Sequence, residues 1–313
     1  MGPANTRSMV EGAMLSAITI IISIIALYVP VLGIFASLIW PVPIVILGIR
    51  HGLRTSILST AVAGIAVAMF QGPAQAFNVV LGFGLLGVVM GWAIRRKFSP
   101  YKVLFIGSAA SLVSEVALIV MTIYIMGFNP MKMELSAMKD SIALVGNMYK
   151  NMGVSPETVK QIVDSYGKLL DFFTLAIPAL LVMSSVVSAF LNYQVTKLIL
   201  SRLGQKLEDF TPFWLWKLPD YTVFFFLLGV LMNLLEYYWP AGVLKSIGIN
   251  LQLIFGFSFL IEGLSLVTYY MGRFNLAKIL RVLFIFLVFF NPLISQIVLW
   301  AGMFDILFNF RHI

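Results

Sequence analysis

The chain has 313 residues, of which 60% are hydrophobic and only 11% are charged. Soluble domains have about 45–50% apolar and about 25% charged residues, so this composition indicates an integral membrane protein and excludes most soluble enzymes. The sequence lacks cysteine, which excludes disulfides, thiolate metal sites, iron–sulfur clusters and cysteine nucleophiles. Two histidines are too few for a histidine-rich metal cage, and no cofactor is expected.

Nine apolar segments are long enough to cross a membrane, for which a helix needs about 20 residues. They lie near residues 10–29, 34–49, 55–71, 74–94, 102–126, 172–196, 220–238, 245–271 and 279–304. The first is longer than the apolar core of a signal peptide and has no A-x-A cleavage site before Pro30, so we expect it to be retained. The second is interrupted by Trp40-Pro41-Val42-Pro43, and a re-entrant segment is the alternative there. The sequence therefore predicts an all-α integral membrane protein with about nine transmembrane helices.

The basic residues predict the orientation of these helices, because they concentrate on the cytoplasmic side. With the N-terminus inside and nine crossings, 14 of the 21 basic residues lie inside and seven outside. The seven are Lys132, Lys139, Lys150, Lys160, Lys168, Lys245 and Arg311. Without the second crossing the division would be eight inside against 13 outside, so a crossing is favoured. This predicts a cytoplasmic N-terminus and an extracytoplasmic C-terminus. Because orientation and anionic lipids explain the net charge of +8, no nucleic-acid binding is expected.

The longest segment outside the predicted spans, residues 127–171, balances five lysines against five acidic residues and has helical periodicity. We expect two short amphipathic helices, the second starting at Ser155-Pro156. They form either a hairpin on the bilayer surface or over the bundle, or a lid above an outward-facing site. On the inner side, residues 199–219 mix aromatic and charged side chains, which indicates an interfacial segment or a docking surface for a partner.

Two carboxylates, Glu115 and Glu262, fall deep inside predicted spans, where an ionisable group is costly and needs a reason. Counting from Lys102 and Arg273 places both near the midplane, and no lysine or arginine is predicted at that depth to pair with them. Each is either a proton-coupling or cation-recognising group, or a neutral packing residue hydrogen-bonded to nearby serines. Those serines are Ser111 and Ser114 for Glu115, and Ser258 and Ser265 for Glu262.

Further polar residues are candidate ligands. Gln71, Gln75 and Asn78 gather at the predicted outer end of the third and fourth spans. Glu236 beside Tyr237-Tyr238-Trp239 belongs either to an interfacial aromatic belt or to an aromatic-walled ligand pocket. Asn291-Pro292 lies about half-way along the last span, where proline frees a backbone carbonyl; such a break is common in transporters but also occurs in other helices.

Gly82-Phe-Gly84-Leu-Leu-Gly87 matches the dinucleotide-binding pattern, but it lies inside an apolar span without a preceding strand, which excludes that function. Gly87-x-x-x-Gly91 instead predicts close helix packing. The sequence has no P-loop, H-E-x-x-H or G-x-S-x-G motif, so we expect no enzymatic activity and any energy coupling must come from a partner or an ion gradient.

Three segments of the N-terminal region resemble the substrate-binding (S) components of energy-coupling factor transporters. They are the small-residue motif Ala13-x-x-x-Ala17, the run from Pro43 to Gly52, and the glycine-rich run from Phe83 to Arg96. The resemblance implies that Ala13 and Ala17 form a face that meets the shared transmembrane coupling subunit. It also implies solute uptake across a prokaryotic membrane with ATPases acting in trans.

Over its full length the chain is similar to the YybS-like family of uncharacterised bacterial membrane proteins. The similarity implies an S-component-like six-helix bundle in residues 1–200 and a three-helix extension in residues 201–313. It favours a protein of the bacterial cytoplasmic membrane that binds a small, vitamin- or precursor-like solute from outside. The alternative is a non-transport scaffold of the envelope. An intramembrane enzyme, with Glu115 and Glu262 as a facing pair, is the third possibility.

Overall fold

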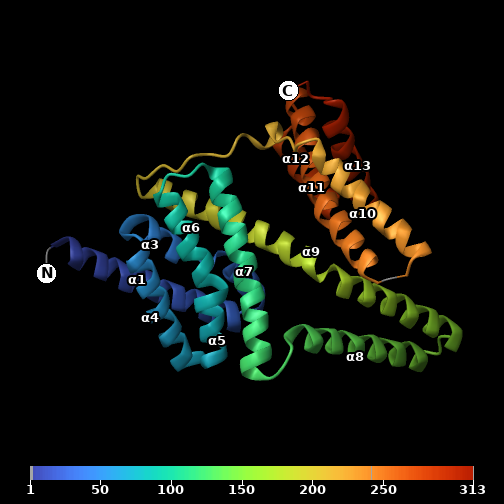
Figure 1. Cartoon of the computed structure of the whole chain (residues 1–313), viewed down its shortest axis with the longest axis horizontal. Coiled ribbons are helices and arrows are strands. Elements are labelled where there is room, and N and C mark those ends of the chain that lie inside the picture. The colour runs from blue at the N-terminus through green and yellow to red at the C-terminus, as the bar shows by residue number, and fades with distance from the viewer. Residues whose placement is uncertain (1–2, 241, 313) are drawn as a thin grey trace. The chain divides into compact units, whose positions relative to one another are not determined.

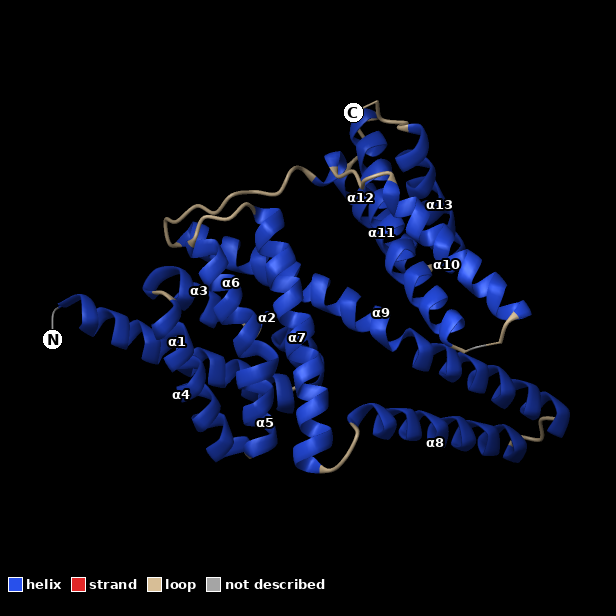
Figure 2. Ribbon diagram, in the orientation of Figure 1, coloured by secondary structure: helices blue, strands red, loops and turns tan. Residues whose placement is uncertain are grey.

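The computed structural model describes residues 3–240 and 242–312, and all of its regular elements in these ranges are helices (Figures 1 and 2). Eight of the described helices are long and apolar enough to cross a membrane, or nine if one strongly bent pair counts as a span. This confirms the predicted all-α multi-pass membrane protein.

The chain forms two compact units, and both are discontinuous in sequence. Unit 1 comprises Met1–Asp140 and Ser184–Asp209, and unit 2 comprises Ser141–Met183 and Phe210–Ile313. This division differs from a single boundary near residue 200, because helix α9 (Pro156–Arg202) is continuous and contributes to both units.

Unit 1 contains the helices of the first five predicted spans. They are α1 (Pro3–Tyr28), α2 (Pro30–Ile39), α3 (Val42–His51), α4 (Leu53–Gln71), α5 (Pro73–Phe77), the π-helix Asn78–Gly84, α6 (Leu85–Arg95) and α7 (Pro100–Met126). The first part of α8 (Pro130–Asn151) and the end of α9 complete the unit. Glycine and proline separate these helices: Gly52 and Gly72 adopt positive φ at the two ends of α4, and Pro73 and Pro100 begin the helices that follow.

The second span is interrupted at Trp40-Pro41, as its sequence suggested, but residues Val31–His51 together retain the length and apolarity of a crossing. Trp40 is buried and stacks on Phe83, with ring centroids 4.4 Å apart. Asn192 of α9 donates a hydrogen bond of 2.9 Å to the Leu38 carbonyl next to the break. A side-chain amide thus satisfies a backbone group at the interruption, which keeps the broken helix stable in an apolar core.

Helices α3 and α6 pack closely through glycines, which confirms the expectation for Gly87-x-x-x-Gly91 (Figure 1). A Cβ atom on Gly91 would lie 2.8 Å from the Val45 carbonyl oxygen and 3.1 Å from the Gly48 Cα atom. A Cβ atom on Gly87 would lie 2.8 Å from that of Ile44. Only hydrogen at these positions lets the two backbones approach so closely.

Unit 2 contains the second part of α8, the first part of α9 and four further helices. These are α10 (Tyr221–Tyr238), α11 (Val243–Arg273), α12 (Lys278–Phe290) and α13 (Pro292–Phe308), preceded by the short 3-10 helix Phe213–Leu215. The two amphipathic helices predicted for residues 127–171 are both present, but the second does not end where expected. It continues into the sixth span as the 47-residue helix α9, because Gly167 near Asp171 does not adopt the positive φ of a helix C-terminus and no proline lies between Pro156 and Pro178.

Pro178 lies inside α9, where it removes one backbone donor and disturbs the helix. The Asn250 side chain of α11 bridges this site: it donates to the Leu175 carbonyl at 2.7 Å and accepts from the Ala179 N–H at 2.6 Å. These are the two groups that an undisturbed helix would join directly. Asn250 therefore provides partners for two backbone groups beside Pro178 and attaches α11 to α9 within unit 2.

Helices α12 and α13 do not form a straight ninth span, because the chain bends by 105° at Asn291-Pro292. After α13, the Phe310 carbonyl accepts from the Tyr270 hydroxyl at 3.0 Å, and Arg311 donates to the Trp214 carbonyl at 3.0 Å. The chain thus returns to the end of unit 2 where α10 starts and α11 finishes. Within unit 2, Arg311 thus contacts residues that the charge distribution places inside, whereas the same distribution counts Arg311 itself outside. The extracytoplasmic C-terminus stays a prediction, and its alternative, a re-entrant last segment, would divide the 21 basic residues into fifteen inside and six outside.

For a re-entrant last segment, we expect His312 and Phe274 to be exposed on one side of the membrane and Trp239 on the other. Single cysteines are readily introduced at these three exposed positions, because the natural chain contains none. A membrane-impermeant maleimide added to intact cells should label Trp239→Cys and leave His312→Cys and Phe274→Cys unlabelled until the membrane is opened. The cysteine-free chain is the control. Labelling of positions 312 and 239 from the same side would instead show that the last segment crosses the membrane as a ninth span.

Candidate functional site

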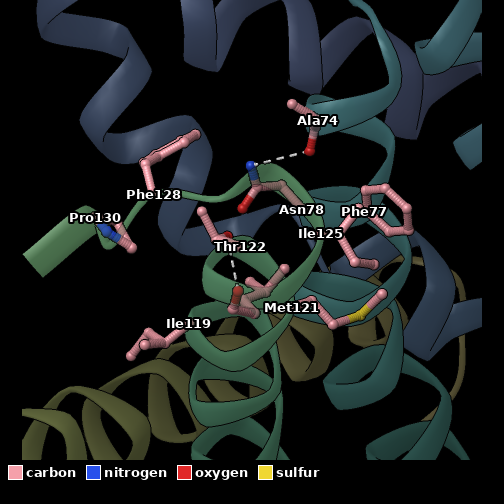
Figure 3. A pocket seen from close by; sticks show the side chains of 10 residues that line it. Ala74, Phe77, Asn78, Ile119, Met121, Thr122, Ile125, Phe128 and Pro130 are labelled. Carbon is pink, nitrogen blue, oxygen red and sulfur yellow. Dashed lines mark hydrogen bonds between the residues drawn. The ribbon is translucent and has the colours of Figure 1, made fainter.

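A pocket of about 280 Å³ lies in unit 1, between the start of the π-helix, α7 and the segment that follows α7 (Figure 3). Most of its lining is apolar, and Asn78 and Thr122 supply the polar groups. The remaining lining residues are Ala74, Phe77, Leu118, Ile119, Met121, Ile125, Phe128 and Pro130. These residues belong to the end of unit 1 that the charge distribution assigns to the outer side, at the beginning of the segment 127–171, for which a helical hairpin and a lid are the alternatives.

The backbone places Asn78 at an irregular point of the fourth span. Gly72 breaks the chain with φ of 91°, Pro73 restarts it, and the helix then widens into a π-helix that begins at Asn78. The Asn78 amide donates to the Gln75 side chain at 3.2 Å and to the Ala74 carbonyl at 3.5 Å, which orients its oxygen for a further interaction. π-Helical turns frequently occur at functional sites, because the extra residue redirects side chains from the regular helical positions.

Of the four candidate ligands predicted in this part of the chain, Gln71, Gln75, Asn78 and Glu115, only Asn78 lines this pocket. Gln75 lies behind Asn78 as its hydrogen-bond partner. Gln71 accepts a hydrogen bond from Ser23 of α1 at 3.1 Å, so it connects two helices. Glu115 accepts from Ser111 at 3.4 Å, which the packing alternative named as a partner, and from Ser184 of α9 at 3.0 Å, which it did not name. The predicted partner Ser114 is buried, and its hydroxyl has no partner among the described residues.

Glu262 lies in a different setting from the one its position in the sequence indicated. It forms an ion pair with Arg311, and the two side chains are each only 1% exposed. The expectation that no basic residue is available to Glu262 is therefore wrong. The partner was missed because Arg311 follows a segment that looked like a complete crossing.

The contacts of α11 show where Glu262 lies along unit 2. Helices α10 and α11 come close at Gly229, midway along α10, where an added Cβ atom would lie 2.9 Å from the Gly248 carbonyl. Glu262 lies 14 residues beyond Gly248, about 21 Å along the helix. Its second oxygen accepts from the Leu218 N–H at 3.0 Å, just before α10 begins. Glu262 is thus near the end of the bundle.

Arg311 is the centre of a buried polar cluster that the sequence did not indicate. Its guanidinium group donates to Asp305 at 2.8 Å and to the Ser265 hydroxyl at 2.7 Å, in addition to Glu262 and the Trp214 carbonyl. Ser265 hydrogen-bonds to the Phe213 carbonyl at 2.7 Å and does not bond Glu262 directly. The cluster fastens the C-terminal residues and the segment before α10 to α11, which indicates a structural role.

Two further predicted ligands are helix caps. Glu236 accepts from the Gly242 N–H at 2.7 Å and from the Lys245 N–H at 3.3 Å, so it caps the start of α11. The neighbouring Tyr237, Tyr238 and Trp239 are highly exposed, as in an interfacial belt rather than a pocket wall. Asn291 caps α13 by accepting from the Leu293 and Ile294 N–H groups at 3.0 and 3.3 Å.

The small-residue motif of α1 faces outward. Ala13 and Ala17 are exposed, whereas the preceding residues Gly12 and Ser16 are buried against α4, where Ser16 donates to the Ser59 carbonyl at 3.3 Å. The motif therefore remains available for contact with lipid or with another protein.

No group of three or more metal-binding side chains occurs among the residues that the structure describes. Glu115 and Glu262 belong to different units and have separate hydrogen-bond partners, so no facing carboxylate pair is observed within either unit.

Comparison with known proteins agrees with the membrane architecture. A family model described as "Predicted membrane protein (DUF2232)" matches residues 17–306. A Bacillus subtilis (strain 168) protein, described as uncharacterized protein YybS, is 28% identical over 308 residues, which cover 98% of each chain. No solved structure matches the chain. The similarity to the YybS-like family is confirmed, and that to S components stays a prediction. The chain belongs to the DUF2232 family of predicted membrane proteins.

Proposed function

We propose that the protein binds a small, vitamin- or precursor-like solute from the extracytoplasmic side of the bacterial cytoplasmic membrane, as part of a transport system. The observation that carries this proposal is the pocket of about 280 Å³ beside Asn78. Its volume is close to the lower end of small-molecule sites, which are typically about 300–1,000 Å³ and combine apolar walls with a few polar groups. In the proposed orientation, with the N-terminus in the cytoplasm, Phe128 and Pro130 cover the pocket from outside.

The lining also restricts the chemistry of the solute. It contains no charged side chain, so an ionised ligand would lose its hydration without compensation. A neutral solute with an apolar body and one hydrogen-bond donor for the Asn78 oxygen fits best. We propose that energy is supplied in trans by ATPases that act through a transmembrane coupling subunit. The exposed Ala13 and Ala17 support this part of the proposal, because small residues allow close helix contact.

The proposal is tested by thermal-shift screening of the purified full chain against neutral vitamins and their precursors. We expect at least one compound to raise the melting temperature in proportion to the logarithm of its concentration. Asn78→Leu should weaken its binding about tenfold, the value of one hydrogen bond of roughly 1–1.5 kcal/mol. Thr122→Val, which keeps the side-chain shape, should also weaken binding.

Thr174→Val is the matched control. Thr174 and Thr122 both donate to the carbonyl four residues earlier, at 2.9 and 2.7 Å, but Thr174 lies outside the pocket. A compound that binds the Asn78 and Thr122 variants as tightly as the natural chain does not occupy this pocket. If no compound binds and envelope proteins, rather than ATPases, copurify after mild solubilisation, the scaffold function is favoured instead.

A further inference from the structure

A second pocket, of about 330 Å³, lies in unit 2 where α11 ends and α12 begins. It is lined by Trp214, Thr268, Tyr269, Gly272, Arg273 and Arg281. Arg273 is the last residue of α11, and Arg281 lies in the first turn of α12. The connecting turn has Asn275 at φ of 51°, with the Leu276 N–H bonded back to the Met271 carbonyl at 3.0 Å. The helix ends thus bring two guanidinium groups to one cavity.

Neither arginine forms an ion pair with any residue that the structure describes. The sequence contains no aspartate or glutamate between Gly263 and Phe304, and the acidic residues on either side of that range, Glu262 and Asp305, both bond to Arg311. Within the described part of the chain, the side chain of Arg281 forms one hydrogen bond, from its Nε to the Leu276 carbonyl at 3.0 Å. The other nitrogens of its guanidinium group remain available for an anion.

The position of Arg281 also favours an anion. The N-terminal turn of a helix carries a partial positive charge, so a cation there is unfavourable unless a negative group lies nearby. The planar guanidinium group matches the oxygens of a phosphate and binds them in pairs. Lys278, the first residue of α12, adds a further positive charge at the same helix end.

The surroundings indicate a lipid phosphate. Large apolar side chains next to the pocket are exposed, with Phe274 at 71%, Ile279 at 76% and Val282 at 67%. A free phosphate would leave this surface uncovered, whereas the acyl chains of a lipid would cover it. Trp214 beside the arginines is typical of the interface at which headgroups lie. Basic pockets between membrane helices on the cytoplasmic side are known to bind anionic headgroups.

We propose that this pocket binds the phosphate headgroup of an anionic phospholipid, with Arg273 and Arg281 as the phosphate ligands and α12 as the surface for the acyl chains. The site is distinct from the Asn78 pocket and does not depend on the proposed solute. It would anchor the junction of α11 and α12 at one membrane surface.

Native mass spectrometry of the full chain in mild detergent tests the proposal, with phosphatidylglycerol and phosphatidylcholine of the same acyl chains as probes. We expect phosphatidylglycerol to bind more tightly. Arg273→Gln with Arg281→Gln should weaken its binding roughly thirtyfold, since each basic contact at the surface contributes on the order of 1 kcal/mol. Arg54→Gln with Arg202→Gln is the control, because it removes the same charge from exposed arginines outside the pocket.

Three results would overturn the proposal. They are equal binding of the two lipids, an equal loss of phosphatidylglycerol affinity in the pocket variant and the control variant, and displacement of phosphatidylglycerol by excess inorganic phosphate. The last result would identify a site for free phosphate. Fluorescence provides a second test that leaves the arginines intact. Phosphatidylglycerol with brominated acyl chains should quench the tryptophan fluorescence of the natural chain by a larger fraction than that of the Trp214→Phe variant. Equal fractional quenching in the two proteins would contradict a lipid beside Trp214.

Discussion

Replacement of Arg311 by leucine is expected to lower the free energy of unfolding by about 3–5 kcal/mol, because it leaves two carboxylates buried without their basic partner. Glu262 and Asp305 are 1% and 0% exposed, and both bond to the Arg311 guanidinium. The Trp214 carbonyl and the Ser265 hydroxyl lose a donor in the same variant. Arg311→Lys should be intermediate, since one ammonium group cannot reproduce the fork that reaches these four acceptors.

Denaturant unfolding of the purified chain, followed by tryptophan fluorescence, measures this effect. Arg96→Leu removes an exposed arginine and is expected to change stability by less than about 0.5 kcal/mol. The triple variant Arg311→Leu, Glu262→Leu and Asp305→Leu should recover most of the lost stability, because an apolar replacement leaves no buried charge unpaired. If Arg311→Leu unfolds like the Arg96 control, the cluster does not hold the C-terminal residues to α11.

The spans were largely predictable, since a run of about 20 apolar residues by itself indicates a membrane-spanning helix. The last segment was not, although its composition is equally apolar. Its path depends on the break at Asn291-Pro292. The sequence shows that the helix is interrupted there, but it does not show in which direction the chain continues. The 105° bend returns Arg311 to Glu262, which is 49 residues away in sequence. A charge count based on one crossing per apolar run therefore separated Arg311 from the residues that it contacts.

Asparagines near proline breaks show a second limit of sequence analysis. Asn291 caps the helix next to its own proline, so its role is local and visible in the sequence. Asn192 and Asn250 act at breaks that lie 154 and 71 residues away. In an apolar core the freed backbone groups need partners, so such asparagines are required, but only the fold shows which break each one satisfies.

The candidate site was predicted in part. Asn78 was selected as a polar residue at the outer end of a span, and it does line a pocket. Gln71 was selected by the same criterion and Glu115 as a carboxylate deep inside a span, yet the side chains of both bond to serines of neighbouring helices. Polarity at membrane depth shows that a partner is needed; it does not distinguish a ligand from a hydrogen-bonding side chain of the same protein.

Gly91→Ala is the second substitution from which we expect a large effect, a loss of about 1–3 kcal/mol in the stability of unit 1. The added methyl group would meet backbone atoms, the Val45 carbonyl oxygen at 2.8 Å and the Gly48 Cα atom at 3.1 Å. Backbone atoms cannot move aside as a flexible side chain can, so α3 and α6 must separate and lose contact along their length.

Gly167→Ala makes the same chemical change in a helix where an added Cβ atom meets nothing within 4 Å. There the methyl group should raise stability by up to about 1 kcal/mol, because alanine favours the helix more than glycine does. The two variants are therefore expected to shift the unfolding midpoint in opposite directions. A stabilising Gly91→Ala would show that α3 and α6 are not in close contact, and the glycines of the fourth span would then need another explanation.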